Sequence, residues 1–228
     1  MLDLKKAFKN IVESEEFKKN QDDILEELTE QQNIDWTTVL NALVTLKNLK
    51  YMGEKDSKID LNKINIIEES ALSIASSSWF LNIVKLLVEK WADINIKTSS
   101  WYTPLMSSCV NWQTEIAEFL IESWASINIK TVINHNGTGE GTALFFATRG
   151  WYIDIVKLLL KKGAYIDNIN ELWLTPLMMA SVNHDIDIIE ILIKSGADKG
   201  IENIYGEHAL DMARNCWCSN EILNLLKQ

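Results

Sequence analysis

The chain has 228 residues, 47% of them apolar, which is enough to bury a core within one large domain or two small ones. It carries 22 basic against 32 acidic residues, and this net charge of -10 argues against nucleic-acid binding, which needs Lys and Arg to neutralise phosphates. The sequence contains no run of 18 apolar residues that could span a membrane, and its charged start lacks the apolar segment of a classical export signal.

Irregular helical patterns occupy the first part of the chain. Residues 22–35 are typical of a helix with its exit, residues 34–43 are typical of a turn followed by a short helix, and residues 47–70 show no regular pattern. We therefore expect a helical N-terminal cap over residues 1–31 and a degenerate first unit near residues 34–67.

A two-helix pattern then repeats along the rest of the chain. Residues 101–130 and 173–202 align without a gap: TPLM occurs in both, and IAEFLI in the first matches IIEILI in the second. Residues 70–97, 142–167 and 208–228 fall into the same register. Successive units begin near positions 68, 101, 140, 173 and 206, and this spacing of 33, 39, 33 and 33 residues indicates an internal repeat.

The repeated residues suit two short packed helices. Thr103 and Thr175 are suited to the N-cap, where the hydroxyl accepts a free backbone N–H, and the prolines that follow them suit the first helical position. The second helix of each unit carries a stripe of Ile, Val and Leu. Because one unit cannot bury both of its faces, we expect the units to stack.

This pattern resembles the ankyrin repeat, in which a turn leads into a short helix opened by T-P-L, followed by a second helix, a G-A-D segment and a return hairpin. The resemblance implies an all-α, ankyrin-repeat solenoid of stacked helix–turn–helix units with short β-hairpin or loop connections. It covers residues 32–228, with units near residues 34–67, 68–100, 101–139, 140–172, 173–205 and 206–228.

The resemblance also gives each unit three habitual glycine positions, and the nine tryptophans all fall on them. Trp36, Trp101 and Trp173 lie in the turn before the first helix, Trp79, Trp112, Trp151 and Trp217 follow the first helix, and Trp91 and Trp124 follow the second helix. Glycine itself fills equivalent positions at Gly163, Gly196 and Gly206. These positions favour positive φ or close backbone approach, which glycine accepts at low steric cost.

Three interpretations of the tryptophans compete: interface aromatics, a deliberate replacement of glycine, or a codon that the source organism reads as glycine and that has been translated as tryptophan. UGA is the obvious candidate for such a codon. The confinement to glycine positions favours the third interpretation, as does the low glycine content of 9 in 228, roughly 4% against an average of about 7%. It predicts positive φ at most of Trp79, Trp91, Trp112, Trp124 and Trp151.

Residues that could carry chemistry form no convincing site. His184 replaces a glycine, His208 replaces the Thr of T-P-L, and His135 lies in a loop. The CWC stretch at 216–218 lacks a second Cys or His pair at zinc spacing, and the glycine-rich residues 136–141 lack the Lys of a phosphate-binding loop. We therefore expect no catalytic residue, no metal and no cofactor, and hence no enzyme. With three cysteines and no disulfide framework, we expect a cytoplasmic location.

In the ankyrin family, partner contacts come from the hairpin turn and from the end of the first helix. The matching positions here are Ser77, Ser78, Ser100, Tyr102, Val110, Asn111, Arg149, Leu172, Leu174, Val182, Asn183, Tyr205, Glu207 and Asn215. As an alternative, Asn111 and Asn183 cap helix ends, and Val110 and Val182 are semi-buried. The connection over residues 131–141 is six residues longer than its counterparts, and long loops on a binding side often carry function.

The resemblance thus implies a monomeric, non-enzymatic scaffold that binds a partner protein through the concave face of the stack, with no nucleic acid and no membrane involved. Two alternatives use the same scaffold differently: a secreted, host-directed effector, or a regulatory or docking subunit of an enzyme on another chain. The fold does not decide between them.

Overall fold

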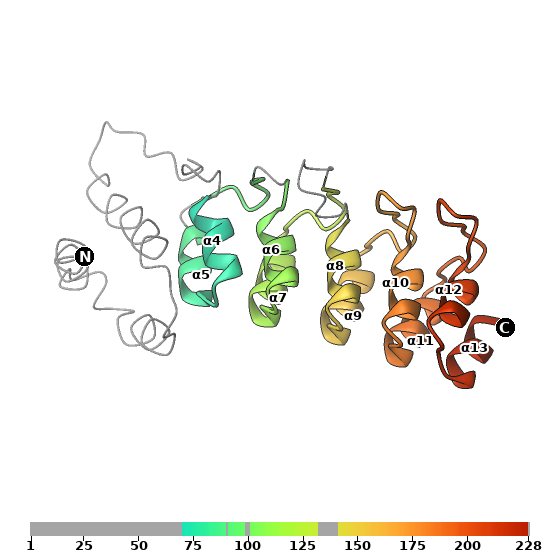
Figure 1. Ribbon diagram of the computed structural model, residues 1–228. Coiled ribbons are helices and arrows are strands. Elements are labelled where there is room, and N and C mark those ends of the chain that lie inside the picture. Colours follow the sequence, from blue (N-terminus) through green and yellow to red (C-terminus); the bar gives the residue numbers. More distant parts are fainter. Residues whose placement is uncertain (1–69, 90, 99–100, 132–140, 228) are drawn as a thin grey trace, which may run out of the picture.

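The computed structural model describes residues 70–89, 91–98, 101–131 and 141–227, and within these ranges ten helices form five stacked pairs (Figure 1). The first helices of the pairs are α4 (Ala71–Ser77), α6 (Pro104–Val110), α8 (Ala143–Arg149), α10 (Pro176–Val182) and α12 (Ala209–Asn215). The second helices are α5 (Leu81–Glu89), α7 (Thr114–Glu122), α9 (Ile153–Lys161), α11 (Ile186–Lys194) and α13 (Asn220–Lys227). The predicted cap over residues 1–31 and the predicted unit near residues 34–67 lie outside the described residues.

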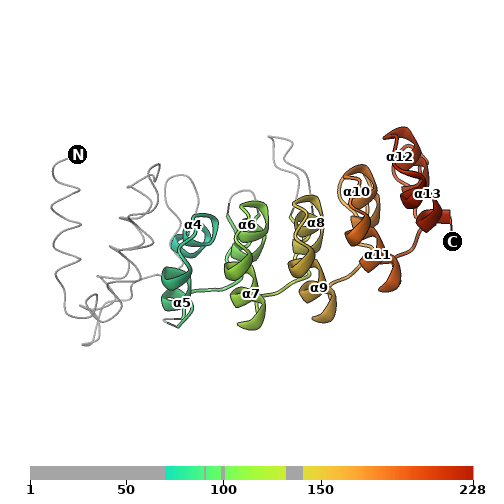
Figure 2. The ribbon, with the colours of Figure 1, turned by 90° about the horizontal axis from the view of Figure 1, so that it is seen from below.

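The helices form two layers, which the view in Figure 2 separates. First helices pack against the first helices of neighbouring units, second helices against second helices, and each first helix also packs against its own second helix. Loops connect successive pairs along one edge of the stack (Figure 1). This is the predicted helical solenoid, although the described connections contain no β-strand.

Side-chain caps fix where the first helices begin, and those at Thr103 and Thr175 are the predicted ones. The side-chain oxygens of Ser70, Thr103, Thr142 and Thr175 each accept the backbone N–H three residues on. His208 occupies this position in the last unit, and there the carboxylate of Asp211 accepts the His208 backbone N–H at 3.2 Å instead. Replacing such a Ser or Thr cap by Ala typically costs about 1 kcal/mol, so the caps contribute to the stability of helices only seven residues long.

Every helix from α4 to α12 ends in a Schellman motif. The N–H two residues beyond the C-cap donates to the carbonyl five residues earlier; examples are Gln113 to Ser108 at 2.9 Å and Ala125 to Leu120 at 3.0 Å. This geometry places the residue directly after the C-cap, one position before the donating N–H, at positive φ. That residue is Trp79 (φ 67°), Trp91 (68°), Trp112 (68°), Trp124 (69°), Trp151 (66°), Gly163 (87°), His184 (59°), Gly196 (92°) or Trp217 (58°). The prediction of positive φ at five tryptophans is confirmed at all five.

The connecting loops between units are closed at their base by a repeated pair of bonds. Thr98, Thr131, Asn170 and Asn203 each donate their backbone N–H to the carbonyl of Tyr102, Gly141, Leu174 and Glu207, respectively. The side-chain oxygen of the same Thr or Asn accepts the N–H of that partner residue, at 2.8 to 3.2 Å. The long connection is therefore closed in the same way as the short ones, although its residues 132–140 lie outside the described ranges.

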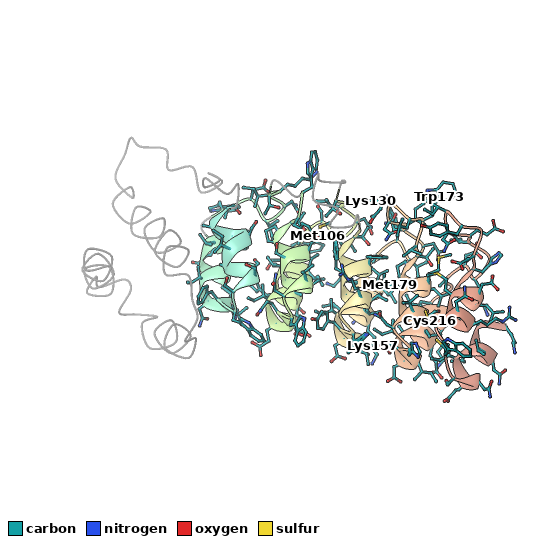
Figure 3. The ribbon with its side chains drawn as sticks, in the orientation of Figure 1. Met106, Lys130, Lys157, Trp173, Met179 and Cys216 are labelled. Atoms are coloured by element: carbon teal, nitrogen blue, oxygen red, sulfur yellow. The ribbon has the colours of Figure 1, made fainter. Side chains whose placement is uncertain are left out.

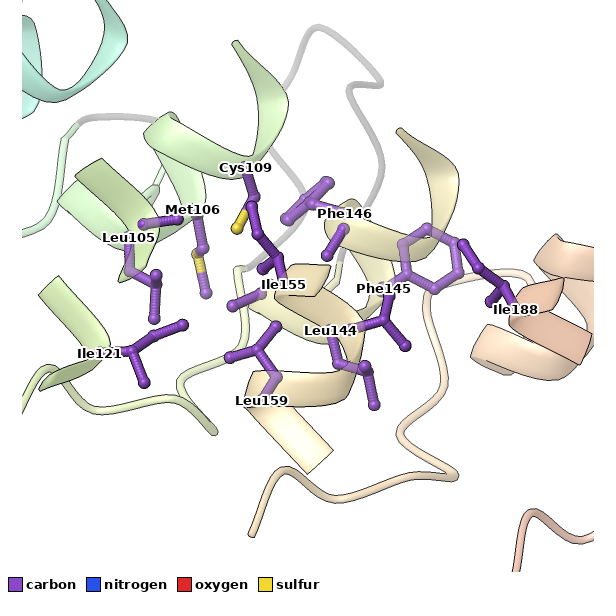
Figure 4. Close-up of a cluster of buried hydrophobic side chains, with 14 of the residues drawn as sticks. Leu105, Met106, Cys109, Ile121, Leu144, Phe145, Phe146, Ile155, Leu159 and Ile188 are labelled. Carbon is purple, nitrogen blue, oxygen red and sulfur yellow. The ribbon is translucent and has the colours of Figure 1, made fainter. Parts of the chain in front are cut away.

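The core runs without interruption through the stack because the side chains of neighbouring units interdigitate. Figure 4 shows Met106 and Cys109 of α6 on one side of Ile155 of α9, with Leu144 of α8 and Leu159 of α9 on its other side. In the second helices most of the predicted stripe is buried: Ile83, Val84, Leu87, Ile155, Val156 and Leu159 are all fully inaccessible, and Leu158 is half-buried. Burial of one such side chain stabilises the fold by about 1.5–3 kcal/mol.

In three of the five described units, a polar side chain near the end of the unit binds the backbone of the next unit. Asn95 Oδ1 accepts the N–H of Ser126 at 2.7 Å, Asn128 Oδ1 accepts the N–H of Tyr165 at 2.8 Å, and Asp167 Oδ1 accepts the N–H of Asp198 at 3.1 Å. Asn128 also donates its Nδ2 to the carbonyl of Gly163 at 3.1 Å. These bonds fix the register between units. The bond from Asp167 is made by a carboxylate that is partly buried.

We expect Asp167→Asn to stabilise the fold at neutral pH. Burial, reinforced by the Asp198 carboxylate and opposed by the Asp198 N–H, raises the pKa of Asp167, so stability falls as pH rises through that pKa. Asparagine keeps the acceptor oxygen without the charge. The substitution should raise the free energy of unfolding at pH 7 by more than it does near pH 3.5. Urea unfolding at both pH values measures this.

The reverse exchange, Asn128→Asp, should lower the free energy of unfolding at pH 7. A loss of stability in Asp167→Asn at pH 7 would contradict the argument.

We also expect the stack to be insensitive to the length of the long connection. Replacing residues 132–140 by the three residues Ser-Ser-Gly, with glycine at the left-handed position that Gly206 occupies in the last described loop, leaves Thr131 and Gly141 to close the loop through the same bonds that Asn203 and Glu207 make. The midpoint of thermal unfolding should therefore change by less than about 2 °C. A large drop in this midpoint would show that the nine residues contribute to the core.

Candidate partner-binding face

The candidate binding residues lie on the loops and first helices, a surface that we call the hairpin–helix face. Tyr102, Leu172, Leu174, Tyr205 and Glu207 lie in the connecting loops and form one row. Val110, Asn111, Arg149, Val182 and Asn183 lie at the C-terminal ends of the first helices and form a second row, with Ser77, Ser78 and Asn215 at the ends of the stack. A seven-residue helix is about 10 Å long, which separates the two rows. Ser100 lies outside the described residues.

Several exposed apolar side chains of this face lie in the loop row. Leu172 is 38% exposed and Tyr205 is 73% exposed. Ile204, which the sequence analysis missed, is 46% exposed, and its N–H donates to the carbonyl of Leu172 at 3.2 Å, which joins the two neighbouring loops. Figure 3 shows Lys130 and Trp173 at this edge of the molecule, with Lys157 near the opposite edge. An apolar residue beside a tyrosine in a loop tip was the signal that could have identified Ile204.

Other members of the loop row hold the fold together. Tyr102 is half-buried, and its ring centroid lies 5.1 Å from that of Phe146 in the next unit. Burial raises the pKa of Tyr102, against the opposing effect of Arg149. Leu174 is half-buried against the core. The carboxylate of Glu207 accepts bonds from the side-chain amides of Asn203 and Asn215 at 3.0 and 2.8 Å.

The helix-end row likewise contains both residues that stabilise the fold and residues that are exposed. Asn111 donates its Nδ2 to the carbonyl of Ser107 at 2.8 Å, which caps its own helix. Asn183 donates its Nδ2 to the carbonyls of Arg149 and Thr148 at 3.2 and 3.4 Å, which caps the helix of the preceding unit. Both asparagines thus make the capping bonds that the alternative interpretation predicts. Val182 is half-buried as that interpretation predicts, whereas Val110 is 43% exposed.

The Cys and His residues considered as candidates for catalysis or metal binding either have structural roles or do not cluster. Cys218 is buried, its Sγ donates to the carbonyl of Ser181 at 3.1 Å, and burial raises the pKa of this thiol, which disfavours the reactive thiolate. His184 is exposed at a helix end. Within the described part of the chain, no three His, Cys, Asp or Glu residues lie close enough together to hold a metal ion. His135 and residues 136–140 lie outside it.

The helices described here are all too short or too polar to cross a membrane.

Two substitutions should separate structural residues from exposed ones on this face. Asn183→Ala removes the donor to two carbonyls of the neighbouring unit, so we expect the free energy of unfolding to fall by about 1 kcal/mol. Tyr205→Ala removes a side chain that is 73% exposed and should change stability by less than about 0.5 kcal/mol. Urea denaturation of both variants tests this, and equal losses would contradict the assignment.

Comparisons with known proteins agree with this architecture. The family model "Ankyrin repeats (3 copies)" matches residues 17–131 and 129–203. An ankyrin repeat protein of Rickettsia felis (strain ATCC VR-1525 / URRWXCal2) is 32% identical over 163 residues, which cover 67% of this chain and 70% of that protein. The ankyrin repeat protein YahD of Escherichia coli (strain K12) is 25% identical over 162 residues, or 68% of this chain and 78% of that protein.

Another relative matches only a local segment of the chain. Ankyrin repeat and SOCS box protein 11 of Homo sapiens is 37% identical over 82 residues, which cover 36% of this chain and 25% of that protein. The match to the family model, by contrast, extends over most of the chain and includes four of the five described helix pairs in full. The chain therefore belongs to the ankyrin repeat family.

Proposed function

We propose that this chain is a non-enzymatic scaffold that binds a partner protein through the concave side of the stack, on its hairpin–helix face. Ankyrin repeats are a general protein–protein interaction module, and stacked repeats present extended binding surfaces. The chain works as a monomer in the cytoplasm, without a cofactor.

The observation that carries this proposal is the apolar strip formed by Leu172, Ile204 and Tyr205. These side chains are exposed, and the backbone bond between Ile204 and Leu172 holds the two loops together. Tyrosine and aliphatic side chains on an ordered backbone bind a partner with little further loss of conformational entropy. Leu174, in the same loop as Leu172, is half-buried against the core and anchors that loop.

Thr131 and Gly141, which flank the long connection, form a closed base equivalent to those of the other loops. We propose that the long connection adds to the contact area with the partner. Its replacement by a three-residue loop is then expected to weaken binding while the stack stays folded.

Paired variants test the apolar strip. The double variant Leu172→Ser, Tyr205→Ser should lose capture of the partner from an extract of the source cells. The control Tyr165→Ser removes a tyrosine that is 65% exposed but follows the second helix α9, and it should capture the partner as the parent does. Quantitative mass spectrometry of the captured proteins gives the readout.

The expected result is one or more proteins that are retained by the parent and the control and reduced at least tenfold by the double variant, a change that corresponds to about 1.4 kcal/mol of binding free energy. Equal capture by all three proteins would exclude the apolar strip as the binding site.

A further inference from the structure

We infer that the native protein carries glycine at all nine tryptophan positions. The described residues contain eight of the nine tryptophans, and each of them has φ between 58° and 69°. Non-glycine residues adopt positive φ in only a few per cent of cases, and for a bulky side chain such a backbone is an outlier. Eight occurrences out of eight by chance would have a probability on the order of 10⁻¹¹ or below.

The positions are defined by the repeat. Six of the eight tryptophans occupy the left-handed position of a Schellman motif, which Gly163 and Gly196 occupy in other helices. Trp101 and Trp173 occupy the left-handed position of the loop turn, and Gly206 occupies it in the last described loop. Tryptophan and glycine thus alternate at equivalent positions of one repeat. His184 is the single exception among the non-glycine residues at positive φ in the described ranges.

A side chain has room at these positions, but it does not become part of the buried core. A Cβ atom built on Gly163, Gly196 or Gly206 would meet no atom within 4 Å. The described tryptophan side chains are accordingly 44% to 92% exposed, and none belongs to the buried core. The Lys97 ammonium lies 4.5 Å from the Trp101 ring centroid, a contact that any exposed indole next to a lysine can make. The constraint at these sites is therefore backbone conformation alone.

A binding role explains the distribution poorly. Binding aromatics gather on one face, whereas these indoles lie at three separate places in the unit: the loop turn, the end of the first helix and the end of the second. Their shared feature is a left-handed backbone conformation, and they do not share one surface of the stack. Interface aromatics also occur in ordinary conformations, so binding gives no reason for a preference for positive φ.

Translation of one codon explains all nine residues at once. UGA is a stop codon in the standard code, tryptophan in one alternative code and glycine in another. A gene from an organism that reads UGA as glycine, translated with the tryptophan code, shows glycine wherever a GGN codon is used and tryptophan wherever UGA is used. This accounts for the mixture of glycine and tryptophan at equivalent positions.

The coding DNA and the native protein provide the direct test. All nine codons, including that of Trp36 outside the described residues, are expected to be UGA, and peptides from the source organism are expected to contain glycine at these sites. The native protein should then show tyrosine absorbance and no indole fluorescence. UGG codons, or a native peptide that contains the indole, would overturn the inference.

Stability gives a second test with a matched control. Trp124→Gly removes the left-handed strain and should raise the midpoint of thermal unfolding by about 2–4 °C. Trp124→Ala also removes the indole but keeps the strain of a Cβ at positive φ, so it should produce no such rise. The reverse exchange, Gly196→Trp, should lower the midpoint. Equal effects of glycine and alanine at position 124 would overturn the conformational argument. None of these measurements depends on a binding partner.

Discussion

In the described part of the chain, the fold depends on a left-handed residue at the end of each helix from α4 to α12. The first helices are only seven residues long, too short to be stable alone in water, and they persist because each turns back at once onto a second helix and onto the next unit. The Schellman motif makes this reversal within two residues and satisfies the free carbonyls of the helix end. A residue that resists positive φ therefore strains the reversal on which the burial of both helices depends.

Stacking makes the stability a sum of local terms between neighbours. Each unit contributes core side chains to the units on either side, and the polar bonds from Asn95, Asn128 and Asp167 reach only the next unit. Strain at one helix end consequently affects one pair of interfaces. Several strained ends in successive units add up, and at about 1–2 kcal/mol each they would remove a large part of the usual stability of about 5–15 kcal/mol.

The sequence was sufficient for features that depend on neighbouring residues. The caps at Thr103 and Thr175, the stripe of the second helices and the backbone conformation at Trp112 and Trp124 all follow from short-range patterns. Contacts between units were not predictable in this way. The packing of Tyr102 on Phe146 and the bond from Asn183 to Arg149 depend on how far one unit is shifted against the next, which no single repeat specifies. Roles inferred from family position alone therefore included residues that hold the stack together.

The closed loop base has a consequence for how such a chain diversifies. A Thr or Asn at positions 98, 131, 170 and 203 fastens both ends of each connection with its own backbone and side chain, so this closure does not depend on the residues in between. Length and composition are then free to drift at a connection, except where a bond such as that from Ile204 to Leu172 couples it to its neighbour. The same closure makes the Thr131–Gly141 junction a suitable place to graft an epitope or a reporter peptide onto the scaffold.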